Sequence, residues 1–222
     1  MFQPTTLKFL KDLKKNNNKE WFEKNRKIYE AAKADYLNFV ANVIKELQKK
    51  DASITGLDTK QCVFRINRDV RFSKDKSPYK SNMGASFNKG GKKVMNAGYY
   101  FHLEPGACFI AGGLWMPMPP KLKKIRQEID YNFNEFKHII NNKKFKTTFK
   151  DLSRNKEYVL SRPPKDYEIT NPAVEYLKLK SFIVSVKIND EDLLQKNFIK
   201  KVITVFETMY PLIYFLNKAI EE

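Results

Sequence analysis

The sequence has few of the residues on which redox and metal sites usually depend. Two cysteines, Cys62 and Cys108, occur among 222 residues, and neither has a CxxC partner. Their apolar, strand-like surroundings predict buried thiols in a reducing compartment and argue against a redox role. The two histidines, His102 and His138, are too few for a histidine-rich metal cage, although one histidine with carboxylates could still hold an ion. The sequence therefore identifies no cofactor.

Long apolar runs are also missing. The longest, residues 212–216, is far shorter than the roughly 20 residues that cross a bilayer. The first residues lack the charged start, apolar stretch and small-residue cleavage site of a secretory signal. We therefore expect a cytoplasmic protein with no membrane partner.

Arginine is scarce although the chain is strongly basic. The formal net charge is +17, but 35 of the 42 basic residues are lysine and 7 are arginine. A lysine-covered, solvated surface is the simpler interpretation, and a face that binds nucleic acid is the alternative. Arg65, Arg68 and Arg71 nevertheless fall within one seven-residue window. Guanidinium groups at that density favour binding of an oxyanion.

The first half of the chain predicts helices followed by a sheet. Apolar residues recur at spacings of three and four over residues 6–15 and 19–50, which predicts two helices. The period then changes to two, and Pro105-Gly106 is a turn signal between the last two predicted strands. The predicted strands are residues 62–66, 82–87, 97–104 and 107–114. The basic, glycine-containing segment 88–93 is interpreted as a hairpin loop, since no strand–loop–helix context of a phosphate-binding loop surrounds it.

The second half predicts further helices and one more strand. Helices are expected from about Pro120 through Ile140, over residues 144–152 and 171–178, and from Asp190 onward, where Pro211 either kinks the helix or starts a new one. Residues 182–188 alternate as a strand. We predict an α+β fold in which an antiparallel sheet of about five strands packs with N-terminal, middle and C-terminal helices. Because no repeat and no long linker divides the chain, residues 1–222 are predicted to form one composite domain.

Residues 64–80 are the most informative segment. Six basic and two acidic residues leave it with four surplus positive charges. If Phe64 and Ile66 face the core, Arg65 lies on the opposite face of the sheet. The same alternation puts Tyr100, His102 and Glu104 on one face. We therefore expect an antiparallel sheet that brings Arg65, His102 and Glu104 together beneath the loop that follows Arg65.

Two interpretations of this segment remain open. In the first, Arg68, Asp69, Arg71 and Asp75 pair with one another and pin a long loop, within a protein-interaction or nucleic-acid-binding scaffold that is not an enzyme. In the second, the surplus charge forms a pocket for a phosphate-bearing small molecule. The predicted ligand-binding residues are Arg65, Arg68, Arg71, Lys74, Lys76, Tyr79 and Lys80.

Candidate catalytic residues are His102, Glu104 and Asp69. An imidazole near a carboxylate, beside arginines that stabilise negative charge, can perform acid/base chemistry. A histidine that is simply hydrogen-bonded within the sheet is the competing interpretation. For Trp21, Tyr99, Tyr100 and Trp115, packing in the core is favoured over stacking on bases or sugars. Whether the protein is an enzyme stays undecided at this point.

The string R-I-N-R-D-V-R-F-S-K-D-K-S-P-Y-K, residues 65–80, belongs to a recognisable pattern. Residues 18–22, 98–106, 112–115 and 162–165 extend that pattern along the chain. The sequence resembles a widespread family of conserved hypothetical proteins of bacteria and fungi, a domain of unknown function with the signature RxxRDxRFSKDKxPYK. This resemblance implies a single cytosolic domain, and it brings no reaction, cofactor or catalytic residue. Pro164 departs from the family, whose members often have a single proline followed by Lys-Gly.

Overall fold

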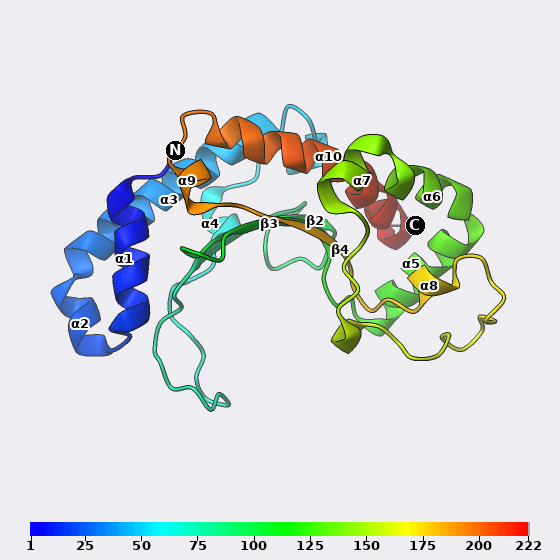
Figure 1. Ribbon diagram of the computed structural model, residues 1–222, viewed down its shortest axis with the longest axis horizontal. Coiled ribbons are helices and arrows are strands. Elements are labelled where there is room, and N and C mark those ends of the chain that lie inside the picture. The colour runs from blue at the N-terminus through cyan, green and yellow to red at the C-terminus, as the bar shows by residue number, and fades with distance from the viewer. Residues whose placement is uncertain (222) are drawn as a thin grey trace. The chain divides into compact units, whose positions relative to one another are not determined.

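The protein has an α+β fold, as predicted (Figure 1). The structure is a computed structural model that describes residues 1–221. Its strands form one antiparallel sheet in the order β1-β2-β3-β4. The strands are β1 Met83–Phe87, β2 Gly98–Leu103, β3 Phe109–Leu114 and β4 Phe182–Lys187. The α-helices are α1 Pro4–Lys15, α2 Lys19–Lys24, α3 Arg26–Leu47, α4 Thr59–Cys62, α5 Pro119–Tyr131, α6 Phe133–Asn141, α7 Lys143–Phe149, α8 Val174–Leu177, α9 Asp190–Leu193 and α10 Phe198–Glu221, and the 3-10 helices are η1 Ala52–Ile54 and η2 Lys156–Tyr158.

The described residues group into two compact units. The first unit comprises Met1–Val94, Tyr100–Ile110 and Lys187–Thr204, and it holds all of the candidate site residues. The second comprises Met95–Tyr99, Ala111–Val186 and residues 205–221. None of the helices in residues 1–221 is long and apolar enough to cross a membrane.

An aromatic core holds the first unit together. The rings of Phe2, Phe39 and Phe198 surround Phe101 of β2, with centroid distances of 6.0, 4.6 and 5.8 Å. All four side chains are buried. Burial of such large apolar surfaces is the main contribution to stability. One face of β2 is therefore fixed against helices.

The long helix predicted over residues 19–50 is two helices, α2 and α3. Asn25 ends α2 with φ −104° and ψ 15°, and its side-chain amide donates to the Trp21 carbonyl at 2.9 Å. Asparagine competes for backbone partners in this way and so interrupts helices. Asn18 caps α2 by accepting a hydrogen bond from the Trp21 backbone N–H.

The strand predicted over residues 62–66 is wrong, and its absence leaves four strands in the described chain instead of about five. Asp58 and Gln61 form a capping box that starts α4, and Cys62 is the last residue of that helix. The hydrogen bonds of this capping box stabilise the start of the helix, and they outweigh the tendency of the short alternating pattern to form a strand. Val63 makes only an isolated bridge with Ala85.

Residues 67–79 form a long, irregular hairpin that extends away from the sheet (Figure 1). Its base is closed by an antiparallel bridge between Asn67 and Tyr79 and by a hydrogen bond from the Lys80 N–H to the Ile66 carbonyl at 2.8 Å. Asn17 clamps the base from outside, since its side-chain amide bonds both the N–H and the carbonyl of Tyr79. The hairpin thus has an ordered anchor at the sheet.

The hairpin between β2 and β3 forms where Pro105-Gly106 predicted a turn. Gly106 has a φ of +82°, a conformation that glycine adopts without strain. The Ala107 N–H donates to the Glu104 carbonyl at 2.8 Å and closes the turn. β1 and β2 are neighbours in the sheet, so the segment 88–93 lies in the connection between them, as expected.

The second unit has its own aromatic contacts. Tyr99 packs against Phe206 at a centroid distance of 4.8 Å, and Phe136 packs against Phe215 at 5.5 Å. α5 begins at Pro119, close to the predicted Pro120. α10 continues through Pro211, so no new helix starts there. Tyr99 is buried as predicted, whereas Trp115 is 52% exposed and is not a core residue.

Candidate functional site

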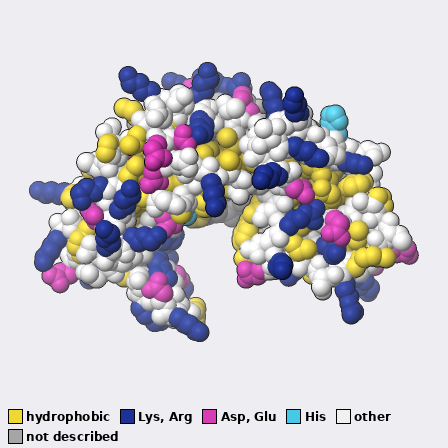
Figure 2. Space-filling view, viewed as in Figure 1, with side chains coloured by type: hydrophobic (Ala, Val, Ile, Leu, Met, Phe, Trp, Pro, Cys, Tyr) yellow, Lys and Arg dark blue, Asp and Glu magenta, His cyan; other side chains and the backbone are white. Residues whose placement is uncertain are grey.

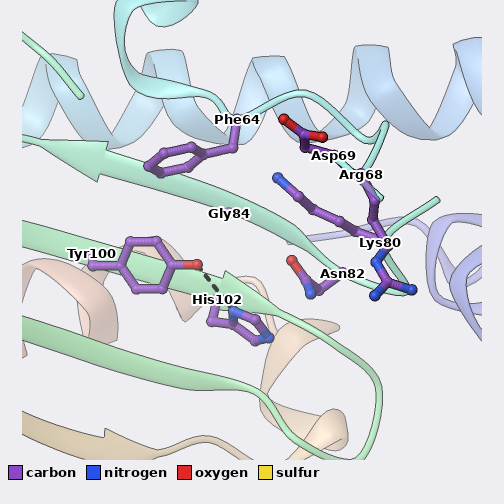
Figure 3. Close-up of a pocket in the computed structure, with 8 residues that line it drawn as sticks. All are labelled: Phe64, Arg68, Asp69, Lys80, Asn82, Gly84, Tyr100 and His102. Carbon is purple, nitrogen blue, oxygen red and sulfur yellow. Dashed lines mark hydrogen bonds between the residues drawn. The ribbon is translucent and has the colours of Figure 1, made fainter. Parts of the chain in front are cut away.

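One face of β2 lines a cavity of about 480 Å³ in the first unit (Figure 3). Phe101 and Leu103 are buried, while Tyr100 and His102 point to the opposite face and are half-buried. Their alternation is the one that the sequence predicts for a strand. The cavity is lined by Phe64, Arg68, Asp69, Lys80, Asn82, Gly84, Tyr100 and His102.

A hydrogen-bonded chain runs through His102. The Tyr100 hydroxyl lies 3.1 Å from His102 Nδ1, and His102 Nε2 lies 3.3 Å from Glu104 Oε2. Phe109 stacks on the imidazole at 4.6 Å with an interplanar angle of 13°. With Nε2–H donating to the carboxylate, Nδ1 is free to accept from the tyrosine hydroxyl. The imidazole thus connects the carboxylate to a hydroxyl that lines the cavity.

Glu104 is held as a carboxylate. Partial burial raises its pKa, but hydrogen bonds from Lys14 and His102, the charge of Lys14 and a hydrogen bond from Ser81 outweigh burial, so the pKa lies below its ordinary value. Lys14 Nζ donates to Oε1 at 2.9 Å, and Ser81 Oγ donates to the same oxygen at 3.2 Å. Glu104 does not itself line the cavity, so its effect on a ligand passes through His102.

Lys80 and Arg68 are the cationic groups that line the cavity. Lys80 Nζ donates to the Arg65 carbonyl at 3.0 Å and lies 5.7 Å from the centroid of the Phe64 ring. Partial burial and the charge of Arg65 lower the pKa of Lys80. Both effects disfavour the ammonium, and the opposite charge of a bound anion would offset them.

The acidic residues of the hairpin are paired with arginines. Arg68 Nη1 donates to Asp75 Oδ2 and, at 3.1 Å, to the Ser77 carbonyl, and Nη2 donates to Ser73 Oγ at 3.3 Å. Arg71 Nε donates to Asp69 Oδ1 at 3.0 Å, and Arg71 Nη2 donates to Asp69 Oδ2 at 2.7 Å. Arg68, Asp69, Arg71 and Asp75 thus pair with one another, which is the pairing that the first interpretation of the motif expects.

Four of the ten predicted site residues line the cavity. Arg68, Asp69, Lys80 and His102 line the cavity, whereas Arg71, Lys74 and Lys76 are exposed elsewhere on the hairpin. Tyr79 is buried against Phe22 at a centroid distance of 3.9 Å. It lines a second cavity of about 330 Å³, which shares Arg68, Lys80 and Asn82 with the first.

Phe64 and Arg65 correct the predicted arrangement of faces. Phe64 does not face the core: it is 38% exposed, lines the cavity and contacts the Tyr100 ring edge-on at 6.3 Å. Arg65 is exposed and does not line the cavity, so it does not join His102 and Glu104. The reason is that residues 62–66 are not a strand, and strand alternation does not apply to them. Ile66 is buried, as predicted.

Sequence reasoning missed Phe64, Asn82, Gly84 and Tyr100. Alternation along β2 already placed Tyr100 beside His102, but its aromatic character favoured the core. Gly84 carried no signal, because its role depends on a contact across strands. A Cβ at position 84 would lie 2.5 Å from the Tyr100 hydroxyl oxygen, so glycine leaves the space that this hydroxyl occupies.

Replacing Gly84 with alanine is therefore expected to displace Tyr100 and lower the free energy of unfolding by about 1–3 kcal/mol, the usual cost of overpacking. Urea denaturation measures this. In the double variant Gly84→Ala/Tyr100→Phe the obstructing oxygen is gone, and the cost of the alanine is expected to fall below about 1 kcal/mol. An equal cost in both backgrounds would show that the hydroxyl is not the obstacle.

The ionisation of Asp75 gives a pH prediction. Hydrogen bonds from the Ser77 hydroxyl and backbone N–H, followed by Arg68, lower the pKa of Asp75 to about 2. Because the folded pKa lies below the unfolded value of about 3.9, this carboxylate stabilises the hairpin fully above about pH 4, and the contribution is lost as pH falls toward 2. The Ser77 amide, which donates to Asp75 at 2.9 Å, is expected to titrate by NMR with a midpoint near 2. A midpoint near 4 would contradict these bonds.

Both cysteines are free and buried, as predicted, and burial raises the pKa of Cys62 to about 12 and that of Cys108 to about 11. Within residues 1–221, no three His, Cys, Asp or Glu side chains come together as a set of metal ligands.

Lysine and arginine side chains are spread over the face seen in Figure 2 and do not gather in one patch there.

Comparison with known proteins gives one result. A search of curated proteins and a search of solved structures each found no match. The family model described as "Conserved hypothetical protein (DUF2461)" matches residues 5–215, which is nearly the whole chain. This agrees with the resemblance seen in the sequence. The chain therefore belongs to the conserved hypothetical protein family DUF2461.

Proposed function

We propose that the cavity on the open face of β2 binds a phosphate-bearing small molecule. The observation that supports this most is the position of Lys80, a partly buried ammonium that lines the cavity and makes no ion pair with a carboxylate of residues 1–221. The carboxylates of the hairpin do not neutralise it, because Asp75 binds Arg68 and Asp69 binds Arg71. An oxyanion is the complement that such a cation lacks.

Arg68 and Asn82 add donors beside Lys80. A guanidinium carries five N–H groups, and the three contacts of Arg68 within the hairpin leave two for a ligand. Those contacts also hold the guanidinium in place before a ligand arrives, which lowers the entropy cost of binding. The Asn82 side chain lies close to Arg68 and Lys80 in the view of Figure 3. Its amide can donate to the same anion.

The Tyr100–His102–Glu104 chain supports acid/base chemistry on the bound molecule. Burial raises the pKa of Tyr100 to about 12, so its hydroxyl is protonated at neutral pH. The tyrosine hydroxyl carries one hydrogen, which it can donate either to His102 Nδ1 or to a ligand in the cavity. In this proposal Tyr100 is the group that exchanges a proton with the ligand. His102 and Glu104 position it and balance its charge.

Inorganic phosphate is the probe that tests this function. Isothermal titration of the wild-type protein at constant ionic strength is expected to show saturable binding at one site. The affinity is expected to change little between 50 and 200 mM salt, since one pocket replaces few counterions, whereas a nucleic-acid face would lose affinity steeply. Heat no different from a chloride titration would refute the phosphate site.

The competing function is a scaffold that is not an enzyme. The Arg68–Asp75 and Arg71–Asp69 pairs favour it, because they show that half of the motif's charges serve the hairpin. In that case nothing would bind at Lys80, and a titration with an oligonucleotide would be the one to show binding. The two functions are thus separated by which ligand gives a signal.

A further inference from the structure

We infer that the phosphate-bearing ligand is a phosphomonoester of a planar ring, and that the ring stacks beside Phe64. This inference rests on the proposed function, since it names the ligand class of the same cavity. The first observation that supports it is the size of the cavity. A cavity of about 480 Å³ lies within the range of sites for drug-sized ligands, and a lone phosphate leaves most of it unfilled.

The cavity has two chemically different ends. Arg68 and Asn82 supply hydrogen-bond donors at one end, Phe64 and Tyr100 lie at the other, and the Lys80 ammonium points into the space between them (Figure 3). A ligand that fills the space must therefore present an anion to the donors and an apolar surface to the rings. A phosphomonoester of a sugar or of glycerol meets only the first requirement.

Phe64 is the residue from which we infer a planar ring in the ligand. Its side chain is 38% exposed, whereas the apolar side chain of Ile66, two residues further on, is buried. Tyr100 contacts Phe64 edge-on at 6.3 Å with an interplanar angle of 61°, so Tyr100 does not stack flat on this ring. Aromatic faces of this kind bind planar rings by stacking, with little dependence on the identity of the ring.

The distance between the Lys80 ammonium and the Phe64 ring limits the length of the link between phosphate and ring in the ligand. Lys80 Nζ lies 5.7 Å from the centroid of the Phe64 ring. A phosphate oxygen bound to this ammonium at about 2.8 Å is therefore within a few bonds of a ring stacked on Phe64. The Lys80 ammonium and the Phe64 ring are thus close enough for one compact ligand to contact both.

The test compares phenyl phosphate, glycerol 3-phosphate and inorganic phosphate by isothermal titration. Wild-type protein is expected to bind phenyl phosphate about tenfold more tightly than glycerol 3-phosphate, which is the size of one aromatic stacking contact. Phe64→Leu is expected to abolish that tenfold preference, measured as the ratio of the affinities of the same variant for phenyl phosphate and glycerol 3-phosphate. Phe64 is partly exposed, so its replacement is compatible with folding.

Phe72→Leu is the matched control, because Phe72 is 95% exposed and does not line the cavity. It is expected to bind all three probes as the wild type does. The wild type could instead bind phenyl phosphate and glycerol 3-phosphate with equal affinity and still bind inorganic phosphate. That result would refute the inference of a planar ring in the ligand and leave the phosphate site intact. Failure of inorganic phosphate to bind would overturn the proposed function itself, and the ring with it.

Discussion

Replacing Lys80 with methionine is expected to lower the affinity for inorganic phosphate by roughly 10- to 100-fold. A charge-assisted hydrogen bond contributes about 1.5–3 kcal/mol, and Lys80 is the one cation lining the cavity that no carboxylate neutralises among the described residues. Methionine keeps the unbranched apolar stem, so the contact with Phe64 is largely preserved. Isothermal titration at constant ionic strength measures the change.

Lys74→Met is the control for Lys80→Met. Lys74 belongs to the same hairpin, is exposed and does not line the cavity, and its replacement changes the net charge by the same amount. Its effect on phosphate affinity is expected to stay below twofold, since charges on the surface are screened by salt. Equal losses in the two variants would mean that phosphate responds to the overall charge of the hairpin, and the assignment of Lys80 would fail.

Replacing Phe101 with alanine is expected to lower the free energy of unfolding by about 4 kcal/mol. Phe101 has no exposed surface and contacts Phe2, Phe39 and Phe198, and large-to-small substitutions at such positions cost about 3–5 kcal/mol. The loss combines the transfer free energy of the ring with the cavity it leaves behind. Urea denaturation monitored by circular dichroism gives the value.

Tyr100→Phe provides the comparison on the other face of the same strand. It removes one hydroxyl and its bond to His102 and leaves the ring, so a cost of about 1 kcal/mol is expected. A loss of less than about 1.5 kcal/mol for Phe101→Ala would contradict the assignment of the two faces of β2. The division matters because it presents Tyr100 and His102 to the cavity.

The sequence contained enough information for the fold class and for much of β2. Alternation placed Phe101 on the core face and Tyr100, His102 and Glu104 on the other, and the Pro105-Gly106 turn fixed the hairpin. These features are local, since period and turn chemistry act over a few residues. They therefore survive in the folded protein with little change.

The candidate site was less predictable because it depends on contacts between distant residues. The capping box at Asp58 turned residues 62–66 out of the sheet and brought Phe64 to the cavity in place of Arg65. Ion pairing also decides which basic residues line the cavity. Asp69, for example, binds Arg71, and Arg71 stays on the hairpin outside the cavity. Spacing in the sequence carries neither piece of information.

Soaking crystals of the protein in tungstate tests the location of the anion site most directly. Tungstate is a tetrahedral oxyanion whose position can be found by anomalous scattering. Its strongest peak is expected within hydrogen-bonding distance of Lys80 Nζ, in the cavity that Arg68, Asn82 and Tyr100 also line. Peaks confined to exposed lysines such as Lys74, with none at Lys80, would contradict a phosphate-binding cavity on β2.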